Sequence, residues 1–151
     1  MIALEHAKKA IKIADHMLTI THNVVNDPKL LLIVTEKLAL SQQHGIKAVL
    51  HYELYHKRIP VFKDNFGEMF ALFKVRCTRR LNLDLQYVDI IHSVQELLEH
   101  HRKSPVEFAR KDNYVICSNE YKTDVISKDL LKKYVEKTKT FIEEIEKMLI
   151  R

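Results

Sequence analysis

Apolar residues recur every three or four positions through most of the chain, which is the spacing of amphipathic helices. The first such stretch spans about residues 2–22 and carries a stripe of small side chains at Ala3, Ala7, Ala10 and Ala14. A break follows, and Pro28 suits the first turn of a second helix. The pattern then stays helical over about 29–57, with apolar positions at Leu31, Val34, Leu38, Ala48, Val49, Tyr52 and Tyr55. Gly45 interrupts it, so one long kinked helix and two shorter helices both fit.

Three more helices are predicted downstream. Asp64 can cap the first of them, whose apolar positions are Phe66, Met69, Phe70, Phe73 and Cys77. Four of the six phenylalanines lie within residues 62–73, so we expect the centre of the core there. The next helix follows a break at Asn82 and Asp84, and its expected inward positions are Val88, Ile91, Val94 or Gln95, and Leu98. Ser127 is a good N-cap for the last helix, which keeps one apolar face through Leu149.

The helical period disappears between residues 103 and 126. Within this stretch, 114–117 is rich in β-forming residues, and a turn at 118–120 would join it to a second short strand. A long structureless loop is unusual in a compact domain. We therefore predict an all-α bundle of about five helices, with a short extended or hairpin segment near residues 112–126. No low-complexity linker divides the chain, so residues 1–151 are expected to form a single domain.

The composition excludes several classes of protein. The chain has only two glycines and three prolines. Phosphate-cradling loops, dinucleotide-binding fingerprints and nucleophile elbows need glycines at fixed spacing, which Gly45 and Gly67 cannot supply. Neither cysteine belongs to a C-x-x-C pair, so a disulfide framework is disfavoured, and Cys77 is expected in the core. The opening segment is charged and no apolar stretch has membrane-spanning length, so we expect a cytoplasmic protein without membrane contact.

The net charge is concentrated in one segment. In total 25 Lys and Arg residues stand against 20 Asp and Glu residues, which gives a net charge of +5. Residues 57–80 contain seven basic and two acidic residues, and this leaves eighteen of each kind in the rest of the chain. Such a local excess favours a polyanionic partner.

Three arginines of this segment are spaced to share one side of the third helix. Arginine suits phosphate because its planar guanidinium donates two hydrogen bonds at once. The predicted nucleic-acid-binding set adds four basic residues that follow the fourth helix, and it comprises Arg76, Arg79, Arg80, Arg102, Lys103, Arg110 and Lys111. Tyr114 lies close by in the sequence and could stack on a base. A second interpretation stays open, in which the arginines complement the helix dipole and pair with surface carboxylates.

Nine histidines raise the alternative of a metal-binding bundle. Dimetal carboxylate bundles use Glu-x-x-His motifs; Glu53-x-x-His56 matches once, and Asp89-x-x-His92 is an imperfect copy. Asp89 and His92 share a wholly polar helix face, and Glu53 falls off the apolar seam, so these residues are expected on the surface. No serine or cysteine lies in a recognisable nucleophile context. We therefore assign no metal, no cofactor and no catalytic residue.

The order of predicted elements resembles the HEPN superfamily of small prokaryotic helical bundles. The resemblance spans most of the chain and is carried by the alanine-rich opening helix, by the long second helix through Ala48 and His51, and by the terminal helix from Ser127. Many members of that superfamily are homodimeric ribonucleases with an arginine, four to six further residues and then a histidine. No arginine of this chain precedes a histidine at that spacing. The resemblance thus implies a non-catalytic member and carries over no active-site residue.

These observations favour a non-enzymatic binding module, expected to be a homodimer, that contacts RNA or another polyanion through an arginine-rich surface. Phosphate contacts would then dominate binding. Two alternatives stay open: a regulatory protein that binds another protein through an apolar seam, and an enzyme, either a divergent HEPN-type ribonuclease or a metal-dependent bundle. The amphipathic first and last helices fit both packing inside the monomer and a symmetric dimer interface.

Overall fold

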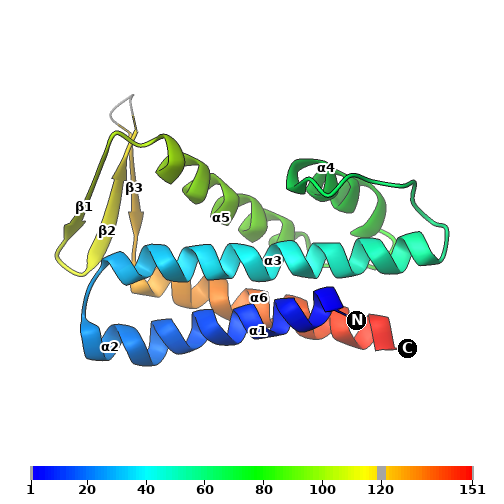
Figure 1. Ribbon diagram of the computed structural model, residues 1–151, viewed down its shortest axis with the longest axis horizontal. Helices are drawn as coiled ribbons and strands as arrows, with labels where there is room; N and C mark the ends of the chain where they lie inside the picture. Colours follow the sequence, from blue (N-terminus) through cyan, green and yellow to red (C-terminus); the bar gives the residue numbers. More distant parts are fainter. Residues whose placement is uncertain (1, 119–121, 151) are drawn as a thin grey trace.

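Three long helices lie side by side along the length of the molecule (Figure 1). The structure is a computed structural model and describes residues 2–118 and 122–150. The first helix is α1 (Ile2–His16), which continues through the π-helix η1 (Met17–Thr21) and α2 (His22–Val25); the other two are α3 (Lys29–Tyr55) and α6 (Lys128–Ile150). Asn26 ends the first helix in the left-handed conformation, with φ 52°. The chain reverses there, so α3 runs antiparallel to α1.

The alanine stripe of α1 packs against α3 within the chain. Ala7, Ala10 and Ala14 are buried, and the hydroxyl of Ser41 on α3 donates a hydrogen bond to the carbonyl oxygen of Ala7 at 2.8 Å. Small side chains permit this close approach of two helices. The alanine stripe is therefore covered by a helix of the same chain and is not free to form a dimer interface. Homodimerisation stays a prediction, and it would have to use another face of the molecule.

A shorter helical segment covers the C-terminal part of α3. It comprises α4 (Phe66–Leu72) and the π-helix η2 (Phe73–Cys77). The prediction that Asp64 caps this helix was wrong by one residue, because the N-cap is Asn65. Asn65 has the extended backbone of an N-cap, and its Oδ1 accepts a hydrogen bond from the backbone N–H of Glu68 at 3.2 Å. Asp64 instead pairs with Lys47 of α3 at 3.2 Å.

The next helix, α5 (Leu85–Lys103), lies across α3. Its buried residues are Tyr87, Ile90, Ile91, Val94 and Leu97. This face is turned relative to the predicted one, on which Val88 and Leu98 are only partly buried. The reason is tertiary: α5 packs against α3, α6 and the sheet at once, and these partners select the face that is covered.

A small antiparallel sheet closes the end of the molecule opposite to α4 (Figure 1). Its strands are β1 (Val106–Arg110), β2 (Asn113–Cys117) and β3 (Thr123–Ile126), in the order β1-β2-β3. Counting α1–α2 and α4–η2 as one helix each, the described residues form five helices, as predicted, but the fold is mainly α rather than all-α. The sequence did not predict β1 because four of its five residues are exposed. Of the predicted turn at 118–120, only Ser118 lies within the described residues.

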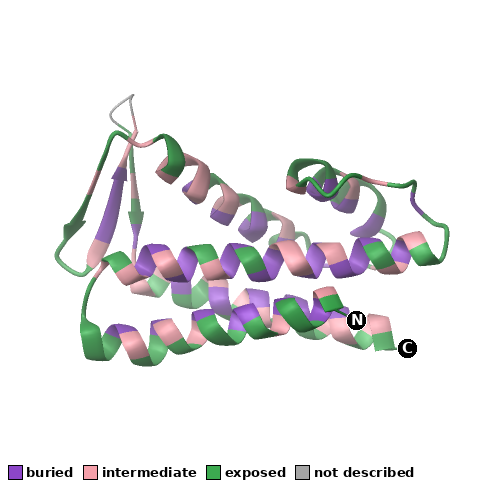
Figure 2. Cartoon of the chain, in the orientation of Figure 1, coloured by how far each residue is buried: buried purple, intermediate pink, exposed green. Residues whose placement is uncertain are grey.

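Two apolar clusters form the core, and Figure 2 shows the buried positions on the faces that the helices turn toward one another. The first cluster lies toward α4 and contains the buried residues Phe73 and Phe141. The centroids of these two rings are 6.0 Å apart. The second lies toward the sheet and contains Ile116 and Ile126. Among the described residues, no helix has the length and apolar character needed to span a bilayer.

Candidate functional site

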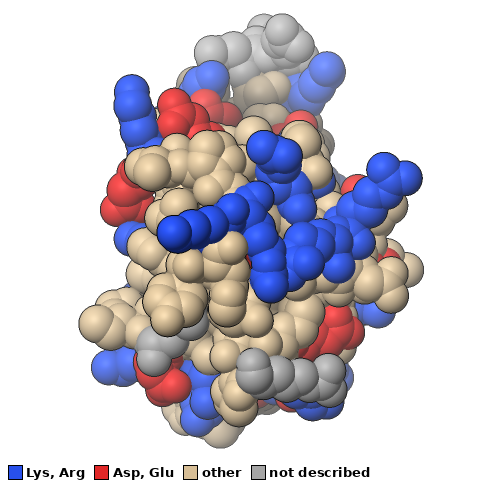
Figure 3. Space-filling view, turned by 90° about the vertical axis from the view of Figure 1, so that its right-hand side faces the viewer, with Lys and Arg blue, Asp and Glu red and all other residues tan. Residues whose placement is uncertain are grey.

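The basic segment of the sequence lies at the α4 end of the molecule (Figure 3). Lys and Arg side chains gather across the middle of this face, and acidic side chains lie toward its edges. We call the following five exposed cations the basic end: Lys57, Arg58, Arg76, Arg79 and Arg80. The first two follow α3, whereas the three arginines belong to η2 and the turn after it. Residues about twenty positions apart in the sequence thus share one surface.

Glu53 joins these two segments. Its side chain is only 1% exposed. Nε of Arg80 lies 3.2 Å from each carboxylate oxygen, and Nη1 of Arg58 lies 3.4 Å from Oε2. Two guanidinium groups therefore share one buried carboxylate, which leaves an excess of positive charge. The expectation that Glu53 lies on the surface was wrong, because the periodicity of α3 cannot show that arginines from other segments cover this position.

The end of α3 brings Arg58 back to Glu53. Lys57 adopts a left-handed backbone with φ 58°. Its N–H donates to the carbonyl of Leu54 at 2.9 Å, and the N–H of Arg58 donates to the carbonyl of Glu53 at 3.0 Å. These two bonds form a Schellman motif, which satisfies free carbonyl groups of the last helical turn. The motif also folds the chain so that the side chain of Arg58 reaches the carboxylate.

The guanidinium groups that Glu53 holds still face solvent. The side chains of Arg80 and Arg58 are 44% and 35% exposed. Within residues 2–118 and 122–150, the two Nη groups of Arg80 have no hydrogen-bond partner, and Arg76 and Arg79 make no ion pair. A guanidinium that is already fixed loses less side-chain entropy when it binds, so this arrangement suits contacts to phosphate oxygens.

Cys77 lies beneath this surface and is fully buried, as predicted for a core residue. Burial, and then the charge of Glu53, raise the pKa of its thiol to about 12, although Arg80 and Arg76 act in the opposite direction. The thiol is protonated at neutral pH, so Cys77 is not a nucleophile there.

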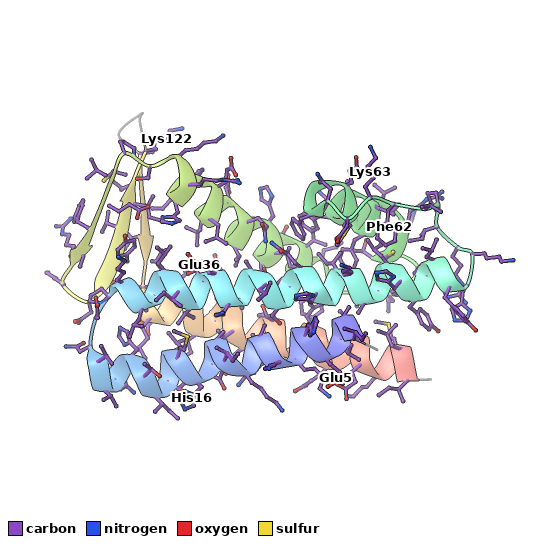
Figure 4. All side chains as sticks on the ribbon, viewed as in Figure 1. Glu5, His16, Glu36, Phe62, Lys63 and Lys122 are labelled. Atoms are coloured by element: carbon purple, nitrogen blue, oxygen red, sulfur yellow. The ribbon has the colours of Figure 1, made fainter. Side chains whose placement is uncertain are left out.

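The structure does not bring the seven predicted binding residues together. Four of them lie at the C-terminal end of α5 and around the turn between β1 and β2: Arg102, Lys103, Arg110 and Lys111. Because α5 has 19 residues, it is about 28 Å long and separates these four from the arginines that precede it. Figure 4 shows the two ends of the molecule, with Lys63 beside α4 and Lys122 at the sheet.

The cations at the end of α5 lie among carboxylates. Arg102 and Lys103 both form ion pairs with Glu99. Arg102 and Glu99 also line an open groove of about 980 Å³ between α3, α5 and the start of α4, together with Glu36 and Glu96. This acidic lining disfavours a polyanion. The interpretation that the cations pair with carboxylates therefore describes Arg102 and Lys103, and also Arg80, which pairs with Glu53. It does not describe Arg76 and Arg79.

Tyr114, which the sequence suggested could stack on a base, is buried and cannot present its ring to a ligand. Tyr114 is only 7% exposed, and its hydroxyl donates to Oε2 of Glu107 at 2.7 Å. Burial, together with this hydrogen bond, raises the pKa of Tyr114 to about 12. The aromatic residue at the basic end is instead Tyr55, which is 82% exposed although the apolar pattern placed it on the helix seam. The signal in the sequence for its exposure is its position as the last residue of the helix.

The Glu-x-x-His motif at Glu53 does not form a metal site in this fold, because its carboxylate faces two arginines. In the part of the chain that the structure describes, no three His, Cys, Asp or Glu side chains are placed to hold a metal ion together. The histidine of the motif, His56, packs edge-on against Tyr52 and Tyr55 instead.

No family model, curated protein or solved structure matches this chain. The HEPN resemblance therefore stays a prediction based on the order of elements. The functional argument depends on the side chains of the basic end and on how the fold holds them.

Proposed function

We propose that the protein is a non-enzymatic binding module that contacts RNA or another polyanion through the basic end. The observation that carries the proposal is the pair of guanidinium groups fixed on buried Glu53, with Arg76 and Arg79 exposed beside them. One carboxylate fixes two arginines but offsets the charge of only one. Bidentate arginine contacts are the strong hydrogen bonds to phosphate, and a local cation excess speeds association with a polyanion.

The double variant Arg76→Ala/Arg79→Ala tests this proposal and leaves Glu53 with both of its partners. We expect its affinity for a single-stranded RNA of roughly 20 nucleotides, measured by fluorescence anisotropy at about 50 mM salt, to fall about tenfold or more. Each phosphate contact on a single strand contributes about 0.7 to the slope of log affinity against log salt. Loss of two contacts should therefore reduce that slope by about 1.4.

The matched control is Arg102→Ala/Lys103→Ala, which removes the same charge at the other end of α5. We expect it to change the affinity by less than about threefold, since these cations already pair with Glu99. Circular dichroism melts would check that both variants are folded. Equal losses in the two double variants would show that binding follows net charge alone, and the basic end would not be the site.

A further inference from the structure

An exposed aromatic cluster adjoins the basic end at the C-terminus of α3. The ring of His56 packs edge-on against Tyr52, with centroids 4.6 Å apart, and against Tyr55, with centroids 5.2 Å apart. Tyr52 is half-buried, whereas Tyr55 is 82% exposed. Tyr55 therefore presents most of its side chain to solvent, while the ring of His56 packs between it and Tyr52.

The same cluster touches the fixed arginines. The guanidinium carbon of Arg58 lies 5.9 Å from the centroid of the Tyr52 ring, within the range of a cation–π contact. Arg58 and Arg80 in turn share the carboxylate of Glu53. A continuous series of contacts thus runs from the exposed ring of Tyr55 to the guanidinium groups, and the aromatic and cationic groups are held in one arrangement.

This combination distinguishes between kinds of polyanion. A single-stranded nucleic acid offers phosphates together with unpaired bases whose faces can stack on an aromatic ring. A duplex keeps its bases stacked inside, and polyphosphate or a sulfated polysaccharide has no base at all. Phosphate contacts alone would not discriminate among these ligands, since they carry no information about the base.

We infer that the basic end selects single-stranded nucleic acid, with an unpaired base stacked on Tyr55 while Arg58 and Arg80 contact the adjacent phosphates. This inference rests on the proposed function, because it assigns the ligand class of the same site. Stacking on a neutral ring adds affinity without releasing counterions. The contribution of Tyr55 should therefore be independent of salt, in contrast to the contributions of Arg76 and Arg79.

The test compares Tyr55→Ala with Tyr55→Phe on two probes, a single-stranded RNA of roughly 12 nucleotides and a duplex RNA of the same length. We expect Tyr55→Ala to weaken single-strand binding about fivefold or more, to leave duplex binding unchanged, and to leave the salt slope unchanged. Tyr55→Phe should keep wild-type affinity, because it retains the ring. Val75→Ala, at a non-aromatic position that is 77% exposed beside Arg76, is the matched control and should change neither affinity.

The outcomes separate the two claims. Equal loss on single-stranded and duplex RNA, or no loss on either, would overturn the stacking inference while the salt-dependent effect of Arg76→Ala/Arg79→Ala still supports polyanion binding. A wild-type protein that binds neither RNA nor a heparin competitor at about 50 mM salt would overturn the proposed function and the inference with it.

Discussion

The backbone of Gly45 lies directly against the side chain of Ile142. A Cβ atom at position 45 would stand 2.8 Å from Cδ1 of Ile142 and 3.2 Å from Cε2 of Phe141. Both of these side chains belong to α6 and are buried. The missing side chain at Gly45 therefore leaves room for Ile142 and Phe141 of α6 to pack against α3, and α3 passes through this position as one helix of 27 residues.

Gly45→Ala should destabilise the protein although alanine is the better helix former. Helix propensity alone predicts a gain of about 1 kcal/mol. Forcing a methyl group against buried Ile142 and Phe141 costs about 1–3 kcal/mol, so we expect a net loss of up to about 2 kcal/mol in the free energy of unfolding. Urea denaturation followed by circular dichroism measures the change.

Gly67→Ala is the control for that substitution. Gly67 is exposed, and its added Cβ would meet only Oδ1 of Asn65, at 3.2 Å. The expected change in unfolding free energy is within about 0.5 kcal/mol. A stabilised Gly45→Ala protein would show that α3 and α6 do not need this close approach.

Removal of the charge on Glu53 should weaken the fold. Glu53→Gln keeps the shape of the side chain but leaves Arg58 and Arg80 without their shared carboxylate. Breaking a fully buried ion pair costs about 3–5 kcal/mol, but both arginines here are partly solvated. We therefore expect a loss of about 1–3 kcal/mol in the free energy of unfolding, measured by chemical denaturation.

The comparison for Glu53 is Glu136→Gln. Glu136 is 63% exposed and lies 3.9 Å from Lys139 of the same helix. Exposed pairs of this kind contribute at most about 0.5 kcal/mol, so the two glutamate variants should differ clearly. Similar small losses in both would mean that the buried carboxylate does not hold the arginines in place.

His44 should make the stability of the fold depend on pH. Burial lowers the pKa of His44 from its usual value, and the charges of His6 and Lys47 lower it further, although Asp64 acts in the opposite direction. Below about pH 6.5 the unfolded chain then binds more protons at this position than the folded chain. The free energy of unfolding should therefore fall as the pH drops through this region.

His44→Gln removes this proton linkage, so the loss of stability between pH 7 and pH 5 should be smaller in the variant than in the wild type. His16 is exposed on the outer side of α1 (Figure 4), and His16→Gln is the control for the effect of a His-to-Gln change on stability. Urea midpoints measured at several pH values would show the difference. An unchanged pH profile in His44→Gln would contradict the prediction.

The positions of the helices follow from residues that are close in the sequence. The last helix begins after Ser127, whose Oγ accepts a hydrogen bond from the N–H of Leu130 at 3.1 Å, as the pattern predicted. Buried Leu131, Val135 and Phe141 lie on its predicted apolar face. Caps and helical periodicity act over three or four residues, so a single sequence is enough to recognise them.

The site depended on contacts between distant segments. The pattern placed Glu53 outside, Tyr55 on the seam and Tyr114 within reach of a base, and the structure reverses all three. Glu53 is buried and pairs with Arg58, just after the end of α3, and with Arg80 from a segment 27 residues away. Tyr55 is exposed because none of the described segments covers it. Which face of a helix is covered depends on its tertiary neighbours, and these do not appear in its own periodicity.

The sequence by itself determined the number of helices, most of their ends and the segment in which the positive charge is concentrated. Only the tertiary structure decided that the fold includes a three-stranded sheet, that α5 separates two groups of cations, and that Gly45 serves helix packing. The physical reason is one of range. Hydrogen bonds and side-chain spacing within a helix are local, whereas burial and charge pairing require partners that the folded chain brings together.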